Sequence, residues 1–315
     1  MRSQVPIPYL FVVGCPRSGT TLLQRMLDAH PKLTVANDTH FIIDLFDPPG
    51  QASRELPLTP DIVERVKSYP RMSRFGLNAG EIDAAASGCK TFIEFVSRLY
   101  ELRARKAGKT LSGEKTPNYV RFMPILHDWF PRSRFIHIVR DGRDVSLSMQ
   151  NWVAKNIRRG KIRGPAKWDL WQHDPVATTA LYWMWQVGSG LRGSMGLPEH
   201  YLQISYEKLV AEPEAQLALV TEFLDVSEAR EMIQFHEGRG RPQSGRSAKS
   251  AWLPITTGLR NWRSNMAKKD VFVFESLAGD LLTSLGYSLS APEANGQLAS
   301  RIDAAKHWWR SRELT

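Results

Sequence analysis

Cysteine is scarce, long apolar runs are missing, and no familiar metal-ligand spacing occurs in this chain of 315 residues. The two cysteines are Cys15 and Cys89. Because Cys15 lies in a glycine-containing turn, we expect no structural disulfide and a reducing, cytoplasmic compartment. No window of about 18 apolar residues occurs, so we expect no membrane span. Pro6 and Pro8 interrupt the first residues, which argues against a signal peptide. Without a carboxylate or histidine cluster, we also expect no metal ion.

Acidic residues are too few to balance the basic ones. The chain has 42 lysines and arginines against 32 aspartates and glutamates, which leaves a net charge of +10. Such an excess favours anionic partners, which include a nucleotide, an acidic acceptor, nucleic acid and a membrane surface.

Residues 9–28 follow the order strand, glycine turn, helix, which is typical of a phosphate-binding loop. The run Tyr9–Val13 is apolar and rich in strand formers, Gly14–Gly19 turns the chain, and residues 20–28 place apolar side chains at helical spacing. Amides at the start of such a helix attract an anion, and the helix dipole adds to them.

This loop departs from the P-loop of nucleotide hydrolases at one position. Gly14 and Gly19 have the expected spacing, but Thr20 stands where that motif has lysine, and the cation is Arg17. The missing lysine argues against an ordinary ATPase or kinase. We predict instead a short 5′ anion whose ligands are backbone amides and the side chains of Arg17, Ser18, Thr20 and Thr21.

A second anion site is predicted where another buried strand ends. Residues 135–139 are apolar apart from one histidine, Arg140 follows them, and Ser148 lies eight residues later on a helix expected from about 143 to 149. The arginine fork and the hydroxyl together suit a second phosphate. The alternative is an Arg–Asp pair that holds the turn 140–144 together.

Two further strands end in polar residues. Asp38 and His40 follow the strand expected at 33–36, and Lys115 closes a short strand that begins near Thr110. Because the carboxyl ends of parallel strands border the ligand crevice, we expect these side chains to reach chemistry there. The alternative for Asp38 and His40 is a turn that caps the helix beginning near Phe41.

The order of these elements predicts an α/β fold, with a P-loop-type parallel sheet of about five strands flanked by helices on both faces. Residues 1–290 are expected to form a single domain with a helical insertion at about 45–110, and residues 291–315 a helical tail. We expect helices at 92–106, at 119–129 with a kink or restart at Pro124, and at 227–236. Residues 151–164 are expected to form a solvated basic loop, and the alternative is a loop that attracts an anionic acceptor. Trp308 and Trp309 in the tail suit either packing on the domain or peripheral contact with a membrane or partner.

Several stretches together resemble sulfotransferases that use 3′-phosphoadenosine 5′-phosphosulfate (PAPS). Residues 14–23 are similar to the 5′-phosphosulfate loop of that family, and residues 138–148 to its 3′-phosphate site. The stretches 28–31, 37–39 and 201–210 resemble the tyrosylprotein-sulfotransferase-like branch and its bacterial relatives. The resemblance spans roughly Pro8 to Trp262 and is weak at 45–110.

The resemblance implies a role for each matching residue. Arg17, Ser18, Gly19, Thr20 and Thr21 would bind the 5′-phosphosulfate, and Arg140 and Ser148 the 3′-phosphate. Tyr206 would contact the nucleotide. Asp38 matches a catalytic glutamate and would deprotonate the acceptor hydroxyl, while Lys115 and Arg17 would meet the leaving group. A further 3′-phosphate contact falls to Arg246, Lys249 or Arg260, and which of them supplies it stays open.

The resemblance therefore implies in-line transfer of a sulfuryl group from PAPS, with PAP as product, to a hydroxyl-bearing acceptor. Carbohydrate, glycolipid, small alcohol or phenol, and peptide tyrosine all remain open as acceptors, and the chain is expected to be a monomer or homodimer that binds no nucleic acid. Two alternatives are kept. One is a P-loop kinase-like phosphotransferase, and the other a non-catalytic protein that binds nucleotides or nucleic acid.

Overall fold

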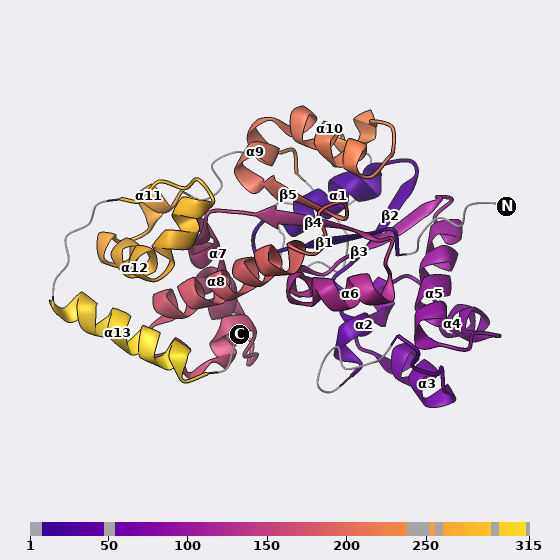
Figure 1. Ribbon diagram of the computed structural model, residues 1–315, viewed down its shortest axis with the longest axis horizontal. Helices are drawn as coiled ribbons and strands as arrows, with labels where there is room; N and C mark the ends of the chain where they lie inside the picture. Colours follow the sequence, from indigo (N-terminus) through magenta and orange to yellow (C-terminus); the bar gives the residue numbers. More distant parts are fainter. Residues whose placement is uncertain (1–7, 47–53, 238–252, 256–260, 291–295, 313–315) are drawn as a thin grey trace.

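The computed structural model describes residues 8–46, 54–237, 253–255, 261–290 and 296–312, and its centre is a parallel sheet (Figure 1). The five strands lie in the order β2-β3-β1-β4-β5. They are β1 (Leu10–Val13), β2 (Leu33–Asn37), β3 (Leu111–Lys115), β4 (Arg134–Val139) and β5 (Tyr201–Ser205). The predicted α/β fold is confirmed, and the apolar runs in β1 and β4 form buried strands that pair in parallel.

Helices cover both faces of the sheet (Figure 1). α1 (Thr20–Ala29), α9 (Tyr206–Ala211) and α10 (Pro213–Phe223) lie on one face, and α6 (Met123–Trp129) and α8 (Pro175–Ser194) on the other. Alternate side chains of β1 serve the two cores: Leu10 and Val12 pack in the cluster with α1, while Phe11 and Val13 pack in the opposite cluster.

A helical insertion lies at the β2 side of the sheet (Figure 1). It contains α2 (Phe41–Asp44), α3 (Pro60–Ser68), the 3-10 turn η1 (Met72–Arg74), α4 (Ala79–Ala86) and α5 (Phe92–Lys106). Capping boxes at Asn78 and Thr91 begin α4 and α5. The bounds predicted for the helix at 92–106 are confirmed.

The opposite side of the sheet carries α7 (Gly142–Ile157), α11 (Trp262–Asn265), α12 (Lys268–Ser284) and α13 (Gly296–Arg310). Arg301 of α13 reaches Asp174 with its Nε 2.8 Å from Oδ2, and Trp308 Nε1 donates to Asp169 Oδ1 over 2.8 Å. α13 thus packs on the domain, while the division at residue 290 stays a prediction. Across the described ranges, no helix combines the length and apolarity needed to cross a bilayer.

One predicted loop and one predicted helix differ in the structure, while the role predicted for Pro124 is confirmed. Residues 151–157 extend α7 and are not loop, because no glycine or proline interrupts the helix there and Val153 is fully buried. The helix predicted at 227–236 is wrong: only the 3-10 turn η5 (Arg230–Met232) forms, with Met232 and Phe235 buried in the cluster that contains α1. Pro124 restarts the chain as predicted, since the 3-10 helix η2 (Pro117–Phe122) ends just before α6.

Candidate active site

The first anion site is a loop whose backbone geometry depends on two glycines. Gly14 has φ +148° and Gly19 has φ +96°. A Cβ on Gly14 would lie 2.5 Å from the Ile138 carbonyl oxygen, and one on Gly19 would lie 2.3 Å from Tyr206 Cδ2. Only glycine therefore allows β4 and Tyr206 to approach the loop this closely.

Donors gather at the start of α1. Leu22 and Leu23 both donate to the Gly19 carbonyl, so the amides of Thr20 and Thr21 precede the intrahelical hydrogen bonds. The Ser18 hydroxyl is fully buried and has no hydrogen-bond partner in the described part of the chain. These groups are oriented as an anion site at a helix N-terminus requires.

Arg17 joins this loop to α7. It has the uncommon φ of +81° for a residue with a side chain, and its Nε donates to Ser148 Oγ over 3.1 Å. The two predicted anion sites, 131 positions apart in the sequence, are thus adjacent in space. They form one site between the ends of β1 and β4.

Arg140 lies at the end of β4 and is 5% exposed. Its guanidinium stacks 4.2 Å from the centre of the Tyr206 ring, and Nη2 is 3.5 Å from Asp144 Oδ2. The Nε atom is buried and has no partner among the described residues. The Arg–Asp pair considered as an alternative therefore exists, but it leaves donor capacity on Arg140 that a phosphate would use.

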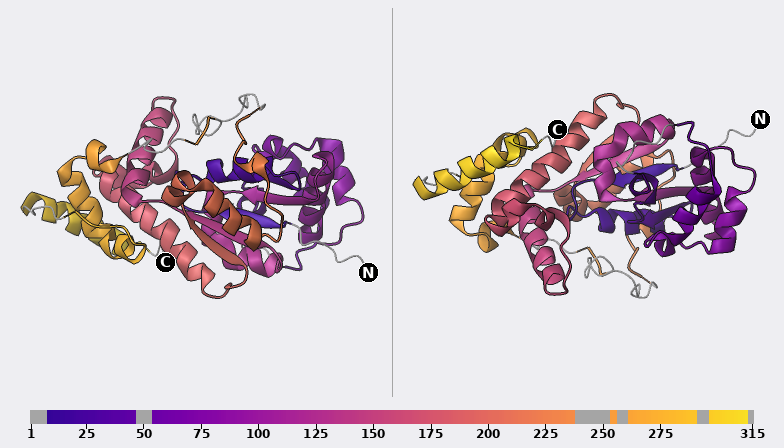
Figure 2. Two further views of the ribbon diagram at one scale, coloured as in Figure 1. Left: turned by 90° about the horizontal axis from the view of Figure 1, so that it is seen from above. Right: turned by 90° about the horizontal axis from the view of Figure 1, so that it is seen from below.

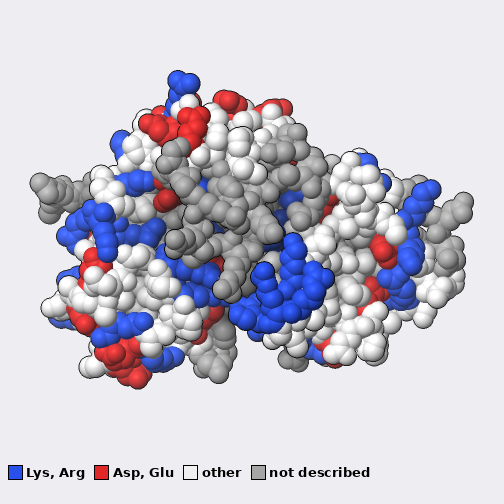
Figure 3. Space-filling view, turned by 180° about the vertical axis from the view of Figure 1, so that it is seen from behind, with Lys and Arg blue, Asp and Glu red and all other residues white. Residues whose placement is uncertain are grey.

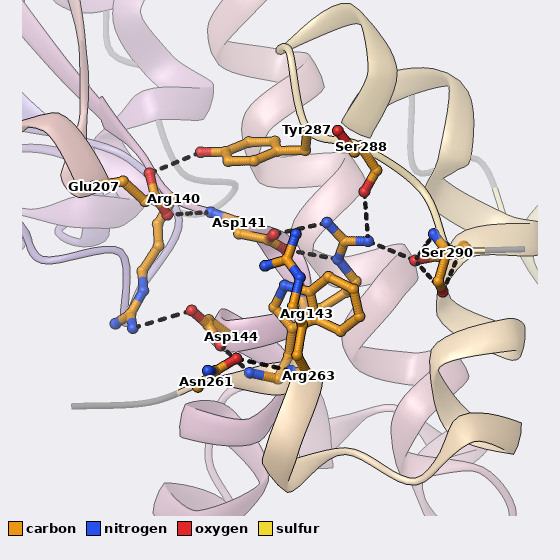
Figure 4. A network of polar contacts seen from close by, with 12 residues as sticks. Arg140, Asp141, Arg143, Asp144, Glu207, Asn261, Arg263, Tyr287, Ser288 and Ser290 are labelled. Atoms are coloured by element: carbon orange, nitrogen blue, oxygen red, sulfur yellow. Dashed lines mark hydrogen bonds and ion pairs between the residues drawn. The ribbon is translucent and has the colours of Figure 1, made fainter. Parts of the chain in front are cut away.

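Arg143, in the same sequence motif, has a different role. Figure 4 shows Arg140 and Arg143 extending in different directions from this turn. Arg143 is fully buried, with Nη2 2.8 Å from Asp141 Oδ2 and Nη1 2.5 Å from Glu275 Oε1. Its guanidinium also stacks 3.7 Å from the centre of the Trp262 ring. Arg143 thus ties the start of α7 to α11 and α12.

Glu207 anchors the same turn from α9. Its Oε1 accepts from the Asp141 amide over 2.9 Å, and its Oε2 accepts from Tyr287 over 3.0 Å (Figure 4). These bonds therefore also fix the position of the neighbouring Tyr206, whose ring stacks on the Arg140 guanidinium. Sequence reasoning chose Tyr206 but missed Glu207, although the two are neighbours.

A second group of residues lies where β2 and β3 end. Asn37 pairs with Lys115 in the sheet, and the Asp38 amide donates to the Lys115 carbonyl over 2.6 Å. Asp38 has φ +62°, which turns its side chain out of the strand direction. The structure thus brings Asp38 and Lys115 together, as the sequence predicted, through the register of two parallel strands.

Basic side chains surround the Asp38 carboxylate, and sequence analysis missed two of them, Arg71 and Arg74. Oδ1 is 2.9 Å from His40 Nε2, and Oδ2 is 3.0 Å from Arg74 Nη1 and 3.8 Å from Arg71 Nη1. Arg71 and Arg74 come from the helical insertion, and no motif marked them. His40 thus contacts Asp38 itself, and its side chain makes no capping bond to α2.

These neighbours shift the pKa values of both catalytic candidates. Burial alone would raise the pKa of Asp38, but Lys115, His40 and Arg71 outweigh it and hold that pKa well below its usual value. Burial lowers the pKa of Lys115, and the negative charges of Asp38 and Glu114 oppose that shift. At neutral pH Asp38 is ionised.

Glu114 holds the loop that carries Asp38. Its Oε1 accepts from the Thr39 amide over 3.0 Å and from the Thr39 hydroxyl over 2.9 Å, while Tyr100 donates to its Oε2 over 2.7 Å. Glu114 is fully buried. Its position directly before the candidate Lys115 was a signal, but only the structure assigns it this supporting role.

Among the described residues no group of three or more histidine, cysteine, aspartate and glutamate side chains is placed to hold a metal ion. Arg246, Lys249 and Arg260 lie outside the described residues, so the choice between them stays open.

A parallel sheet with a lysine-free phosphate loop, a second arginine site and a carboxylate–lysine pair defines a P-loop-type α/β transferase. A profile of the sulfotransferase family matches residues 8–230. The chain belongs to the sulfotransferase family, and it is a sulfotransferase enzyme. The resemblance stated from the motifs is confirmed, and the kinase-like and non-catalytic alternatives are set aside.

Named relatives agree with this assignment. Protein-tyrosine sulfotransferase A of Caenorhabditis elegans is 27% identical over 91% of this chain and 69% of its own length. Protein-tyrosine sulfotransferase 2 of Gallus gallus is 26% identical, over 92% and 71%. The nodulation protein NoeE of the bacterium Sinorhizobium fredii is 24% identical, over 97% and 72%.

Solved structures show the same fold. The sulfotransferase domain from the curacin biosynthetic pathway aligns with a TM-score of 0.61 at 21% identity, over 90% of this chain and 98% of that domain. Mouse sulfotransferase SULT7A1 complexed with PAP aligns with a TM-score of 0.50 at 15% identity, over 96% of this chain and 89% of that one.

Proposed function

We propose that the protein transfers the sulfuryl group of PAPS in line to an acceptor hydroxyl, with Asp38 as the general base. The observation that carries this proposal is the junction of both anion sites through the Arg17–Ser148 hydrogen bond. A ligand with two anionic groups, one on each side of this bond, fits such a junction.

The polar groups of the site fit PAPS. The buried Ser18 hydroxyl and Arg140 Nε, both without partners in the described ranges, are donors that a polar ligand would satisfy. We assign Arg17, Ser18, Gly19, Thr20 and Thr21 to the 5′-phosphosulfate, and Arg140 and Ser148 to the 3′-phosphate. The Tyr206 ring stacks on the Arg140 guanidinium and fills the space beside Gly19.

When bound, PAPS supplies the sulfuryl group and a leaving phosphate. Arg17 and Lys115 provide fixed positive charge for that phosphate, which is the main contribution a protein makes to such transfers. Asp38 accepts the proton that the acceptor hydroxyl loses. Glu114 and the Lys115 carbonyl hold the Asp38 loop, so the carboxylate needs little reorganisation.

The protein sulfates a hydroxyl-bearing acceptor in the cytoplasm. The cations Arg71 and Arg74 border Asp38, and the acceptors kept open are carbohydrate, glycolipid, small alcohol or phenol, and peptide tyrosine. Two of the relatives act on protein tyrosine by name, which favours testing phenols and tyrosine peptides first. The thiols of Cys15 and Cys89 are both free, which supports a reducing, cytoplasmic compartment.

Calorimetric titration tests the donor assignment. We expect metal-independent binding of PAP that weakens by about 10- to 100-fold when the nucleotide lacks its 3′-phosphate. Arg140→Gln should weaken PAP binding to the same extent, because a hydrogen bond to a charged group contributes about 1.5–3 kcal/mol. The same variant should leave binding of the nucleotide without the 3′-phosphate unchanged.

Arg132→Gln provides a matched control. Arg132 is exposed just before β4, at the opposite end of the strand from Arg140. It should bind PAP like the wild type. If Arg140→Gln binds both nucleotides as the wild type does, the 3′-phosphate assignment is wrong.

A further inference from the structure

A strongly basic turn follows α7, outside the active site. From Val145 to Trp168 the sequence contains no aspartate or glutamate. Five cations fall within nine residues of this stretch: Lys155, Arg158, Arg159, Lys161 and Arg163. All five are exposed, and within the ranges that the structure describes none of them has an ion pair or side-chain hydrogen bond.

Two isoleucines lie among these cations. Ile157 is 47% exposed and Ile162 is 65% exposed. We call residues 155–163 the basic turn. Figure 2 shows the end of α7 projecting from the body of the molecule, and Figure 3 shows lysine and arginine side chains gathered on the face seen from behind.

The basic turn has a defined geometry. Gly160 has φ +67° and donates to the Ile157 carbonyl over 2.8 Å, and Lys161 donates to the Asn156 carbonyl over 2.9 Å. This pattern is a Schellman motif, which ends a helix and reverses the chain. Gly164, whose added Cβ would lie 3.1 Å from Trp152 Cζ3, then packs the returning chain against α7.

We propose that the basic turn binds an anionic lipid bilayer. Clustered lysine and arginine side chains are attracted to the negative surface of a membrane, and exposed apolar side chains beside them enter the interface between headgroups and acyl chains. A soluble polyanion would be attracted by the cations, but it would gain nothing from two exposed isoleucines. The isoleucines therefore favour the bilayer.

The position of the turn links the bilayer to the active site. Arg158 directly follows the last residue of α7 and lies ten residues after Ser148, which corresponds to about 15 Å along the helix axis. Binding through the basic turn would hold the sulfuryl-transfer site within that distance of the membrane surface. The inference itself rests on the turn alone and does not depend on the identity of donor or acceptor.

Co-sedimentation of the whole protein with vesicles tests the proposal. We expect binding to vesicles that contain phosphatidylserine, no binding to pure phosphatidylcholine, and weakening with added salt. The triple variant Arg158→Gln, Arg159→Gln, Lys161→Gln should bind roughly 100-fold more weakly, since each cation contributes about five-fold. Ile162→Ser should lower binding by about ten-fold through lost apolar burial.

A second triple variant, Lys32→Gln, Arg105→Gln, Arg132→Gln, has the same charge change at exposed sites elsewhere. It should bind vesicles nearly as the wild type does. Equal loss in both triple variants, or no binding at low salt, would overturn the proposal. A third outcome would also contradict the proposal: vesicle binding needs the cations, is unchanged by Ile162→Ser, and is abolished by polyglutamate. That result would assign the turn to a soluble polyanion instead.

Vesicle binding is measured without donor or acceptor. Failure of the lipid test therefore leaves the sulfotransferase proposal intact, and failure of the PAP titration leaves the lipid test intact. Circular dichroism of each variant checks that the fold is retained.

Discussion

Replacing Asp38 with asparagine tests the proposed base most directly. The carboxylate lies 2.9 Å from His40 Nε2 and 3.0 Å from Arg74 Nη1. Asparagine keeps the shape and one acceptor oxygen but cannot take a proton from the acceptor hydroxyl. General bases contribute on the order of 10² to 10⁴ in rate. We therefore expect kcat to fall within that range while the Kd for PAP stays unchanged.

The basic side chains around Asp38 place the expected loss of kcat near the lower end of this range. Lys115, His40 and Arg71 hold the pKa of Asp38 well below its usual value, against the effect of burial. A carboxylate with such a low pKa is a weak base at neutral pH, so its contribution to the rate is smaller than that of a base matched to the working pH. We expect a loss near the lower end, about 10²-fold.

The assay follows sulfate transfer from PAPS to a phenol or tyrosine peptide under single-turnover conditions, with calorimetry of PAP binding beside it. Asp44→Asn is the matched control, since Asp44 Oδ2 lies 3.6 Å from His40 Nδ1 and accepts from Tyr69 over 3.0 Å. It should retain most of the activity. Asp38→Glu should recover part of it. If Asp38→Asn turns over at the wild-type rate, the base assignment fails.

The remaining predictions concern pH, the glycine loop and the Arg143 network. Burial places the pKa of Lys115 below 10.5, so activity that needs its charge should begin to fall at an alkaline pH lower than 10.5. If Lys115→Arg is active, this alkaline fall should move to higher pH, because arginine stays protonated. The pKa of Asp38 is lower in the folded state than in the unfolded state, so the ionised carboxylate stabilises the fold above the unfolded pKa near 3.8. This stabilisation is lost as the pH falls below that value, and the unfolding free energies of the wild type and Asp38→Asn should therefore converge in acid. Gly19→Ala should lower the free energy of unfolding by about 2–5 kcal/mol in urea denaturation, because the backbone of Gly19 is left-handed and the new Cβ would clash with Tyr206. Gly108→Ala, with φ +66° and open space around it, should lower it by only about 1 kcal/mol. Equal losses in the two variants would contradict the packing argument. Arg143→Met should cost about 3–5 kcal/mol because it leaves Asp141 and Glu275 without their cation; a loss that Glu275→Gln fails to relieve would point to another cause.

The parts of the fold that depend on local sequence were predictable. The first strand, the glycine loop and α1 follow from periodicity and from the Gly14–Gly19 spacing. α5 matched its predicted bounds because apolar spacing and a capping box both mark it. The prediction failed at 227–236, where the burial of Met232 and Phe235 in the core cluster that contains α1 outweighed a weak helical pattern.

The sequence by itself also determined the type of chemistry, because the residue types at the strand ends are local. Thr20 in place of the Walker lysine, Arg17 in the loop and Arg140 after a buried strand indicated two anion sites. The resemblance of residues 14–23 and 138–148 to sulfotransferase motifs then indicated sulfuryl transfer. The family match over residues 8–230 agrees.

Only the tertiary structure decided which groups meet. Arg140 and Arg143 stand in one motif, yet one stacks on Tyr206 beside the site and the other is buried against Glu275. The hydrogen bond between Arg17 and Ser148 joins residues 131 positions apart. Partner choice at such separations depends on strand order and on which helix covers which face, and neither is encoded in any local pattern. The cations that lower the pKa of Asp38 come partly from the insertion for the same reason.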